Sequence, residues 1–217
     1  MYCRCIFSSF FAYIKRGAGL LRFTIAKTKI HITFFFAAGM ALLAVWRGGM
    51  TVLCVLSAVL LHECTHLFCF YFCKAAPSEL TVGLFGMRLS DESTRLLSYK
   101  KELLCTVSAP LVNCCVCLLL LGFLHYGEAV QTLFAVHGSL GAFNLLPVRC
   151  LDGGRSVLCL LYALFSVQKA EQLMTAIEWI FFCLLLIFLI VYFLLVRFEP
   201  TALVFLVYLA FLLFFRK

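Results

Sequence analysis

Charged residues are scarce in this 217-residue sequence, and their scarcity excludes a soluble protein built around one core. Asp, Glu, Lys and Arg make up 13% of the residues, whereas apolar residues make up 65%. A soluble domain usually has about a quarter charged and about half apolar residues. One globular core cannot bury so much apolar sequence. The composition is typical of a polytopic membrane protein, whose outer surface faces lipid.

The sequence also lacks paired Cys-x-x-Cys motifs of the zinc-ribbon kind and any motif of nucleic-acid-binding proteins. Many of the 13 cysteines lie inside apolar runs, where cysteine behaves as a small hydrophobic residue. We therefore expect reduced packing cysteines and no disulfide scaffold. The net charge of +8 predicts no nucleic-acid partner, because the basic residues cluster between apolar spans, as in the cytoplasmic loops of membrane proteins.

Residues 1–29 lack the small-residue cleavage site of a signal peptide. Their apolar stretch is followed by Lys15 and Arg16 instead. The segment is basic and partly apolar throughout. We expect a basic interfacial segment, formed as a helix on the cytoplasmic face of the membrane.

The remaining apolar sequence predicts an all-α polytopic membrane protein with about six transmembrane helices in a single membrane-embedded domain, residues 1–217. A shorter apolar helix, about 154–166, is expected to pack at the membrane edge. Residues 79–90 carry glycines among β-formers, and predict a short membrane-associated β-strand or hairpin after the second span. The predicted spans are about 31–46, 50–73, 103–124, 129–147, 173–196 and 200–215.

The positions of the basic residues predict the orientation of the chain. If the N-terminus is cytoplasmic and the spans alternate, all of the 18 lysines and arginines except Arg47 and Arg197 fall on the cytoplasmic side. The positive-inside rule therefore favours cytoplasmic N- and C-termini, which agrees with an even number of spans. We expect a multi-pass membrane protein.

The motif HECTH in the second span predicts half of a zinc site. His62 and His66 are four residues apart, so on a helix they share one face and can bind one ion. Glu63 can reach a metal-bound water and act as the catalytic base. Polar side chains inside an apolar span cost free energy. Their presence in this span therefore favours a functional role. The alternative is a His–Glu cluster bonded within a helix bundle or serving a proton path.

Asp152 is the candidate for the third ligand that a catalytic zinc site usually has. It lies in NLLPVRCLDGG, after Pro147 and before two glycines. In the charge-based topology the second and fourth spans run in the same direction. His66 then lies about 24 Å and Pro147 about 27 Å from the outer ends of their spans at 1.5 Å per residue. The two halves of the site thus reach similar depth on the cytoplasmic side. Taken alone, Asp152 would be an ordinary Asp-Gly turn.

Two asparagines are weaker candidates for the same site. Asn113 in the third span and Asn144 near the end of the fourth can orient a substrate backbone or stabilise an oxyanion. Hydrogen bonding between helices explains them equally well. Of the other histidines, His31, His125 and His137 are interpreted as structural or interfacial.

The combination of a membrane HExxH with a distant N-L-L-P-x-x-x-L-D-G-G resembles the site-2 protease family of intramembrane zinc metalloproteases. The resemblance covers His62–His66, Ser108–Asn113 and Asn144–Gly154, and also Lys29–Ile30–His31 at the entry to the first span. The six-span layout looks most like the branch of stage IV sporulation protein FB, and this resemblance implies the bacterial cell membrane. The sequence departs from the family at Thr65, where glycine is usual. It also departs at Ser108–Ala109–Pro110 and at Arg149–Cys150.

This resemblance implies an enzyme with one catalytic Zn²⁺ bound by His62, His66 and Asp152, with Glu63 as the base. It also implies that Asn113 acts near the substrate, and that the strand region pairs with an extended, membrane-tethered protein substrate. In the sporulation branch the substrate is a pro-sigma factor, the membrane is the outer forespore membrane, and regulatory membrane proteins are expected. The strand residues singled out for substrate pairing are Gly83, Leu84, Phe85 and Gly86.

Two rival interpretations use the same residues. A membrane metal-ion or proton transporter would line an ion path with His62, Glu63, His66 and Asp152. The sequence weighs against it, because no series of polar residues continues toward the outside. A non-catalytic scaffold is the second rival, and the intact HExxH and Asp-Gly-Gly motifs weigh against that.

Overall fold

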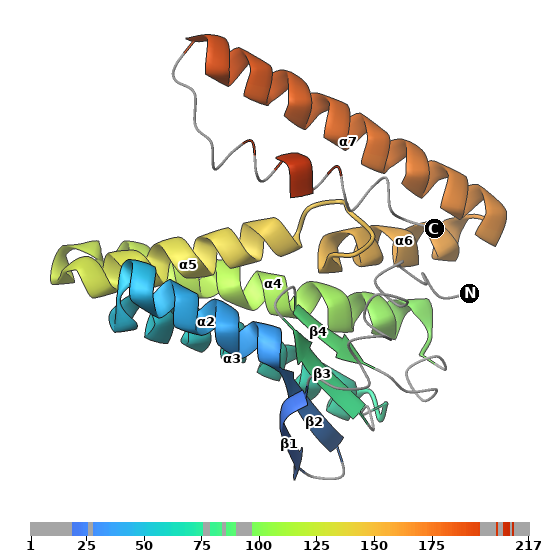
Figure 1. The fold of residues 1–217 in the computed structure, drawn as a ribbon. Helices are drawn as coiled ribbons and strands as arrows, with labels where there is room; N and C mark the ends of the chain where they lie inside the picture. Colours follow the sequence, from blue (N-terminus) through green and yellow to red (C-terminus); the bar gives the residue numbers. More distant parts are fainter. Residues whose placement is uncertain are drawn as a thin grey trace.

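The computed structural model describes residues 19–25, 28–75, 79–83, 86–89, 97–195, 203, 206–208 and 210 (Figure 1). A small β-sheet lies at one end of a set of packed helices. The helices are α2 (Phe34–Arg47), α3 (Gly49–Phe72), α4 (Tyr99–Leu121), η2 (Leu124–Tyr126), α5 (Glu128–Asn144), α6 (Asp152–Leu164) and α7 (Val167–Leu195).

The sheet has four strands in the order β1-β2-β3-β4. Strands β1 (Gly19–Ile25) and β2 (Thr28–Thr33) form an antiparallel pair, β2 pairs with β3 (Glu79–Gly83) in parallel, and β3 pairs with β4 (Gly86–Leu89) antiparallel. The predicted hairpin after the second span is thus confirmed as β3–β4. This hairpin forms one half of the four-stranded sheet, and β1 and β2 form the other half.

The predicted interfacial helix of residues 1–29 is wrong over its described part, because residues 19–25 and 28–29 lie in strands. In β2 the polar residues Lys29, His31 and Thr33 alternate with isoleucines. This period of two, with β-branched side chains, favours a strand over a helix. Residues 1–18 lie outside the described part of the chain. Thr33 ends β2 and caps α2, accepting a hydrogen bond from the Phe36 N–H at 3.4 Å.

Helices occur at the predicted apolar spans, with ends shifted by a few residues. Among the described residues, three helices, α3, α4 and α7, are long and apolar enough to cross a membrane, and α2 contains a shorter apolar helix. Their outward faces expose large apolar side chains such as Leu53, Leu118 and Leu194. The fold is therefore that of an all-α membrane protein with a small sheet. The sixth predicted span, 200–215, lies mostly outside the described residues, so the count of six stays a prediction.

Helices α3, α4 and α5 pack against one another, and α6 packs on α4. Small residues allow α4 and α5 to approach closely. A Cβ on Gly141 would lie 2.7 Å from the Cys114 Sγ and 3.0 Å from the Pro110 carbonyl oxygen. Every described cysteine is a free thiol, which fits the expected role of cysteine in packing. The close packing brings polar side chains of α3, α4, α5 and α6 together.

Candidate metal centre

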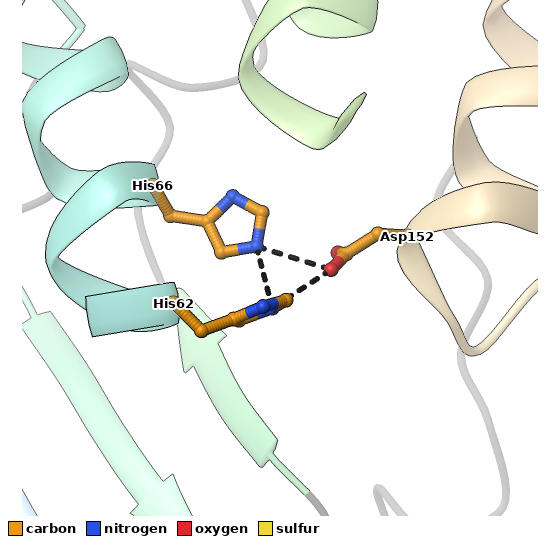
Figure 2. Close-up of side chains that lie close together, drawn as sticks. All are labelled: His62, His66 and Asp152. Atoms are coloured by element: carbon orange, nitrogen blue, oxygen red, sulfur yellow. Dashed lines mark hydrogen bonds and ion pairs between the residues drawn. The ribbon is translucent and has the colours of Figure 1, made fainter. Parts of the chain in front are cut away.

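Three predicted ligands converge where α3 meets the start of α6. His62 and His66 project from one face of α3, and Asp152 is the first residue of α6 (Figure 2). The Asp152 Oδ2 lies 3.1 Å from the Nε2 of each histidine, and the two Nε2 atoms lie 3.2 Å apart. His62 is 4% exposed. Within the described part of the chain, these three residues form the one such group suited to a metal ion.

The hydrogen bond on the far side of the His66 ring sets the tautomer of that ring. Its Nδ1 lies 2.7 Å from the Cys105 carbonyl oxygen, which can only accept, so Nδ1 carries the proton. A neutral His66 then presents a lone pair at Nε2, directly toward the Asp152 carboxylate at 3.1 Å. Two lone pairs at this distance repel unless a cation or an extra proton lies between them. The donor set therefore fits a bound cation.

The spacing of the three atoms fits a tetrahedral zinc site. Tetrahedral ligand atoms bound about 2.0–2.1 Å from Zn²⁺ lie roughly 3.3 Å from one another. The observed separations of 3.1 and 3.2 Å are close to that value. Three protein ligands also leave one tetrahedral position for water or substrate, as catalytic zinc sites do. Two imidazoles and one carboxylate are ligands that zinc accepts.

Asp152 is held in place by the loop before it and by α4. Burial alone would raise its pKa, but the neighbouring His62 and His66 outweigh burial and lower the pKa of Asp152 to about 2. The carboxylate is thus ionised and ready to bind a cation. Its backbone carbonyl accepts a hydrogen bond from the Ser156 hydroxyl at 2.7 Å, and that hydroxyl lies 2.8 Å from the hydroxyl of Thr106.

The two glycines after Asp152 let α6 begin directly against the preceding loop. A Cβ on Gly153 would lie 2.2 Å from the Leu145 carbonyl oxygen, and one on Gly154 would lie 2.1 Å from the Val148 carbonyl oxygen. No side chain fits at either position. The Asp-Gly-Gly sequence is therefore required by backbone packing, and this packing aims Asp152 at α3.

Glu63 is half-buried on α3 beside the first histidine. It lies close enough to His62, His66 and Asp152 for their charges to interact. Cys64 is exposed on another face of the helix, away from the two histidines. Thr65 donates a hydrogen bond from its hydroxyl to the Leu61 carbonyl oxygen at 2.7 Å. Its extra polar atom is thus satisfied within α3.

Asn113 lies behind His62 and is completely buried. Its Nδ2 is 3.1 Å from the His62 Nδ1, and its Oδ1 is 3.1 Å from the Nδ1 of His137. Both ends of the amide therefore face histidines. His137 was predicted to be structural or interfacial. It lies inside α5 and is 4% exposed, four residues before the close-packed Gly141. This spacing puts both on the face of α5 toward α4, so it signals that His137 is buried but not which residue it contacts.

The structure describes some, but not all, of the other predicted substrate residues. The Asn144 Nδ2 donates to the Leu140 carbonyl oxygen of its own helix at 3.0 Å. Gly83 and Gly86 pair at the end of the β3–β4 hairpin, whereas Leu84 and Phe85 lie outside the described residues. β4 is an edge strand of the sheet. A substrate role for these residues stays a prediction.

The sequence analysis identified Arg149 as a departure from the family pattern but assigned it no role. Its backbone N–H and its Nε donate to the two carboxylate oxygens of Glu178 on α7, at 2.8 and 3.1 Å. It also pairs with Glu171 and donates to the Thr175 hydroxyl. The arginine therefore ties the loop before Asp152 to α7. Nothing in the local sequence signals a partner 29 residues away.

Comparison with known proteins finds the same fold in a solved structure. A site-2 protease from Methanocaldococcus jannaschii superposes with a TM-score of 0.60, over 89% of this chain and 92% of that chain, at 19% sequence identity. No protein-family model matches the chain, and no curated protein matches it. The chain therefore has the fold of a site-2 protease, with His62, His66 and Asp152 gathered at one point within it.

Proposed function

We propose that this protein is an intramembrane zinc endopeptidase of the site-2 protease type. The observation that carries the proposal is the convergence of His62, His66 and Asp152 within 3.2 Å of one another, with Glu63 beside them. A membrane fold shared with a site-2 protease supports it. Neither a packing cluster nor an Asp-Gly turn requires this meeting of three ligand atoms.

The chain's own residues divide the chemistry among them. His62, His66 and Asp152 would hold the zinc ion, and the Cys105 carbonyl orients the His66 ring. When bound, zinc supplies Lewis acidity that activates a water molecule and polarises the peptide carbonyl. Glu63 takes the proton of the attacking water and delivers it to the leaving amine. The buried setting of α3 and α4 keeps bulk water from the polar groups that orient the ligands.

The substrate would be a membrane-tethered protein in extended conformation. A helix in the membrane hides its carbonyls in internal hydrogen bonds, so it must unwind before cleavage. The edge strand β4 offers free backbone groups for pairing with such a segment, as in strand addition. Gly83–Gly86 would lie at the end of this pairing surface, and Asn144 would contact the substrate near the site.

A finer proposal concerns the biological setting. By resemblance to the stage IV sporulation protein FB branch, the substrate would be a pro-sigma factor released from the outer forespore membrane. The same motifs support this proposal, with the departures at Thr65 and Arg149–Cys150. Co-expression with a membrane-tethered pro-sigma factor tests it, and cleavage of other tethered proteins but not of this one would contradict it.

A pair of variants tests the proposed function. Glu63→Gln should abolish cleavage of a membrane-tethered substrate, by a factor on the order of 10²–10⁴ for a lost general base, while zinc content by elemental analysis stays at wild-type level. Asp152→Ala should lose both zinc and cleavage. A chelator should abolish wild-type cleavage and added Zn²⁺ should restore it.

Three results would contradict the proposal. Retained cleavage by Glu63→Gln would show that Glu63 is not the catalytic base. Unchanged zinc content in Asp152→Ala would show that Asp152 is not a zinc ligand. Metal-ion or proton flux in liposomes without any proteolysis would favour a transporter that uses the same cluster. Cys64→Ala is the matched control, since Cys64 lies on the same turn of α3 but on another, exposed face.

A further inference from the structure

Two cysteine side chains meet where the end of α3 contacts the start of α4. Cys73 is the C-cap residue of α3, and Cys105 lies in the second turn of α4. Their Sγ atoms are 3.8 Å apart, and the Cys105 thiol donates a weak hydrogen bond to the Cys73 sulfur. The two sulfur atoms are therefore in van der Waals contact, although 32 positions separate the residues in the sequence.

The two thiols differ in their access to solvent. Cys105 is completely buried, in a hydrophobic cluster with Phe70 and Ala75, whereas Cys73 packs against this cluster and is half-buried. A reagent from outside the protein can therefore reach Cys73 but not Cys105. Redox-sensing cysteines have this arrangement, in which an accessible thiol reacts first and a neighbouring thiol then resolves the product.

The neighbouring Cys69 is bonded differently. It lies one turn before Cys73 on α3, and its thiol donates to the Ser108 hydroxyl at 3.1 Å. That hydroxyl donates in turn to the Cys105 carbonyl oxygen at 3.2 Å. Among the described residues, the group suited to a metal ion includes none of these cysteines. The geometry therefore favours a pair of thiols, Cys73 with Cys105, over a site with three thiolate ligands.

A disulfide between Cys73 and Cys105 requires only a local movement. An S–S bond is about 2.05 Å long, so the two sulfur atoms must approach each other from 3.8 Å. Cys105 is held within α4, where its carbonyl accepts the hydrogen bond from His66. Cys73 is the last residue before the chain leaves α3, since Lys74 has a φ of 58°. The end of α3 can therefore make the approach while Cys105 stays in place.

We propose that Cys73 and Cys105 are a site of reversible oxidation, at which a low-molecular-weight disulfide converts the two thiols into an intramolecular disulfide. The Cys73 thiolate attacks one sulfur of the small disulfide, forms a mixed disulfide and releases one small thiol. The Cys105 thiolate then attacks the Cys73 sulfur and releases the second small thiol. Two protein thiols are oxidised, one small disulfide is reduced, and the two protons end on the two released thiols.

The new bond joins the two ends of the segment 74–104, which carries β3 and β4. It holds α3 against α4, and a covalent link of this kind stabilises a fold because it restricts the unfolded chain. If this end of the bundle is cytoplasmic, as the charge rule predicts, the thiols are reduced at rest and pair under oxidising conditions. Neither thiol belongs to the candidate metal centre, so the proposal does not depend on the zinc site.

Mass spectrometry of the full-length protein in detergent tests the pairing. The protein is treated with oxidised glutathione, the remaining thiols are alkylated, and the digest is searched for linked peptides. We expect the Cys73–Cys105 link to be the predominant intramolecular disulfide and to disappear when dithiothreitol is added. Cys69→Ser, the matched control one turn earlier on α3, should keep this link.

Two further variants test the order of the steps. In Cys105→Ala the reaction should stop at the mixed disulfide, with glutathione attached to Cys73. In Cys73→Ser the buried Cys105 should stay a free thiol, because no accessible thiol is left beside it. Glutathione attached to Cys105 in Cys73→Ser would show that this thiol is reached directly, and would overturn the assigned roles of the two residues.

Thermal unfolding in detergent gives a second readout. Oxidation should raise the unfolding midpoint of the wild-type protein by about 5–10 °C and leave the midpoints of Cys73→Ser and Cys105→Ala unchanged. A predominant link between any other two cysteines would overturn the proposal. So would the absence of a Cys73–Cys105 link under conditions that modify the exposed Cys64, and so would an unchanged or lower midpoint in the oxidised wild-type protein.

Discussion

At the scale of single residues, the metal centre depends on two glycines, which have no side chain, as much as on the ligands. Gly153 and Gly154 have no chemistry of their own. Yet the carbonyl oxygens of Leu145 and Val148 occupy the space where their side chains would be. The contact is backbone against backbone, which cannot rotate away as a flexible side chain would. The direction in which Asp152 points is therefore set by its two neighbours.

Gly154→Ala should displace the start of α6 and disorder the metal centre. The added Cβ would stand 2.1 Å from the Val148 carbonyl oxygen, and overpacking of this kind costs about 1–3 kcal/mol or more. We expect a lower thermal unfolding midpoint in detergent and a loss of bound zinc by elemental analysis. Gly49→Ala is the control, because no atom lies within 4 Å of that Cβ position. A wild-type zinc content in Gly154→Ala would show that the α5–α6 loop can move aside for the added Cβ, and would contradict the prediction.

The sequence alone predicted the residues whose chemistry is encoded by local spacing. His62 and His66 are one helical turn apart in any helix that contains them. The Asp-Gly-Gly motif can likewise be recognised from three adjacent residues. His137 could not be predicted in the same way. Its partner Asn113 lies on another helix, and a single buried histidine has no local pattern that identifies such a partner.

At the scale of elements, the loop between α5 and α6 is fixed from both sides. Arg149 joins it to α7 through Glu178, and the side chains of these two residues are 8% and 1% exposed. On the other side, Arg155 of α6 pairs with Glu102 of α4 at 2.8 Å, with side chains 38% and 24% exposed. The first pair is buried and the second is partly solvated, so their contributions should differ.

Glu178→Leu should destabilise the protein by about 3 kcal/mol, the low end for a broken buried ion pair, because Glu171 still faces Arg149. The double variant Arg149→Met/Glu178→Leu should recover most of the loss, since no charge is then left buried without its partner. Unfolding midpoints and zinc content in detergent are the measurements. Arg155→Met, at the more exposed pair, should cost only about 0–1 kcal/mol. Equal losses in Glu178→Leu and Arg155→Met would contradict the burial argument.

The elements themselves were predictable to different degrees. Long apolar runs identify helices in a membrane protein, because a backbone in lipid must satisfy its own hydrogen bonds. The β3–β4 hairpin was visible from its glycines and β-formers. The β1–β2 pair was not recognised, because basic and apolar residues near a membrane also fit an interfacial helix. The parallel pairing of β2 with β3 joins residues about fifty positions apart, and no local pattern encodes such a contact.

At the scale of the whole molecule, two kinds of helix connection lie at opposite ends of the bundle. The α2–α3 and α4–α5 connections contain Gly48 and Gly127, both with positive φ, and lie at the end away from the sheet (Figure 1). The α5–α6 loop, which carries Arg149, and the starts of α4 and α7, which carry Lys100, Lys101 and Lys169, lie at the other end. If the basic end is cytoplasmic, as the charge rule predicts, the metal centre lies toward the cytoplasm.

Epitope insertion in the full-length chain tests this orientation. An epitope placed after Gly127, where an added Cβ would meet no atom within 4 Å, should be reached by antibody in intact spheroplasts. An epitope placed after Ser166, between α6 and α7, should be reached only after the membrane is permeabilised. Both variants should retain zinc, which controls for misfolding. The basic residues favour this result because moving them across the membrane is costly. The reverse labelling pattern would put the metal centre on the outside, and an extracytoplasmic segment would then have to be the substrate.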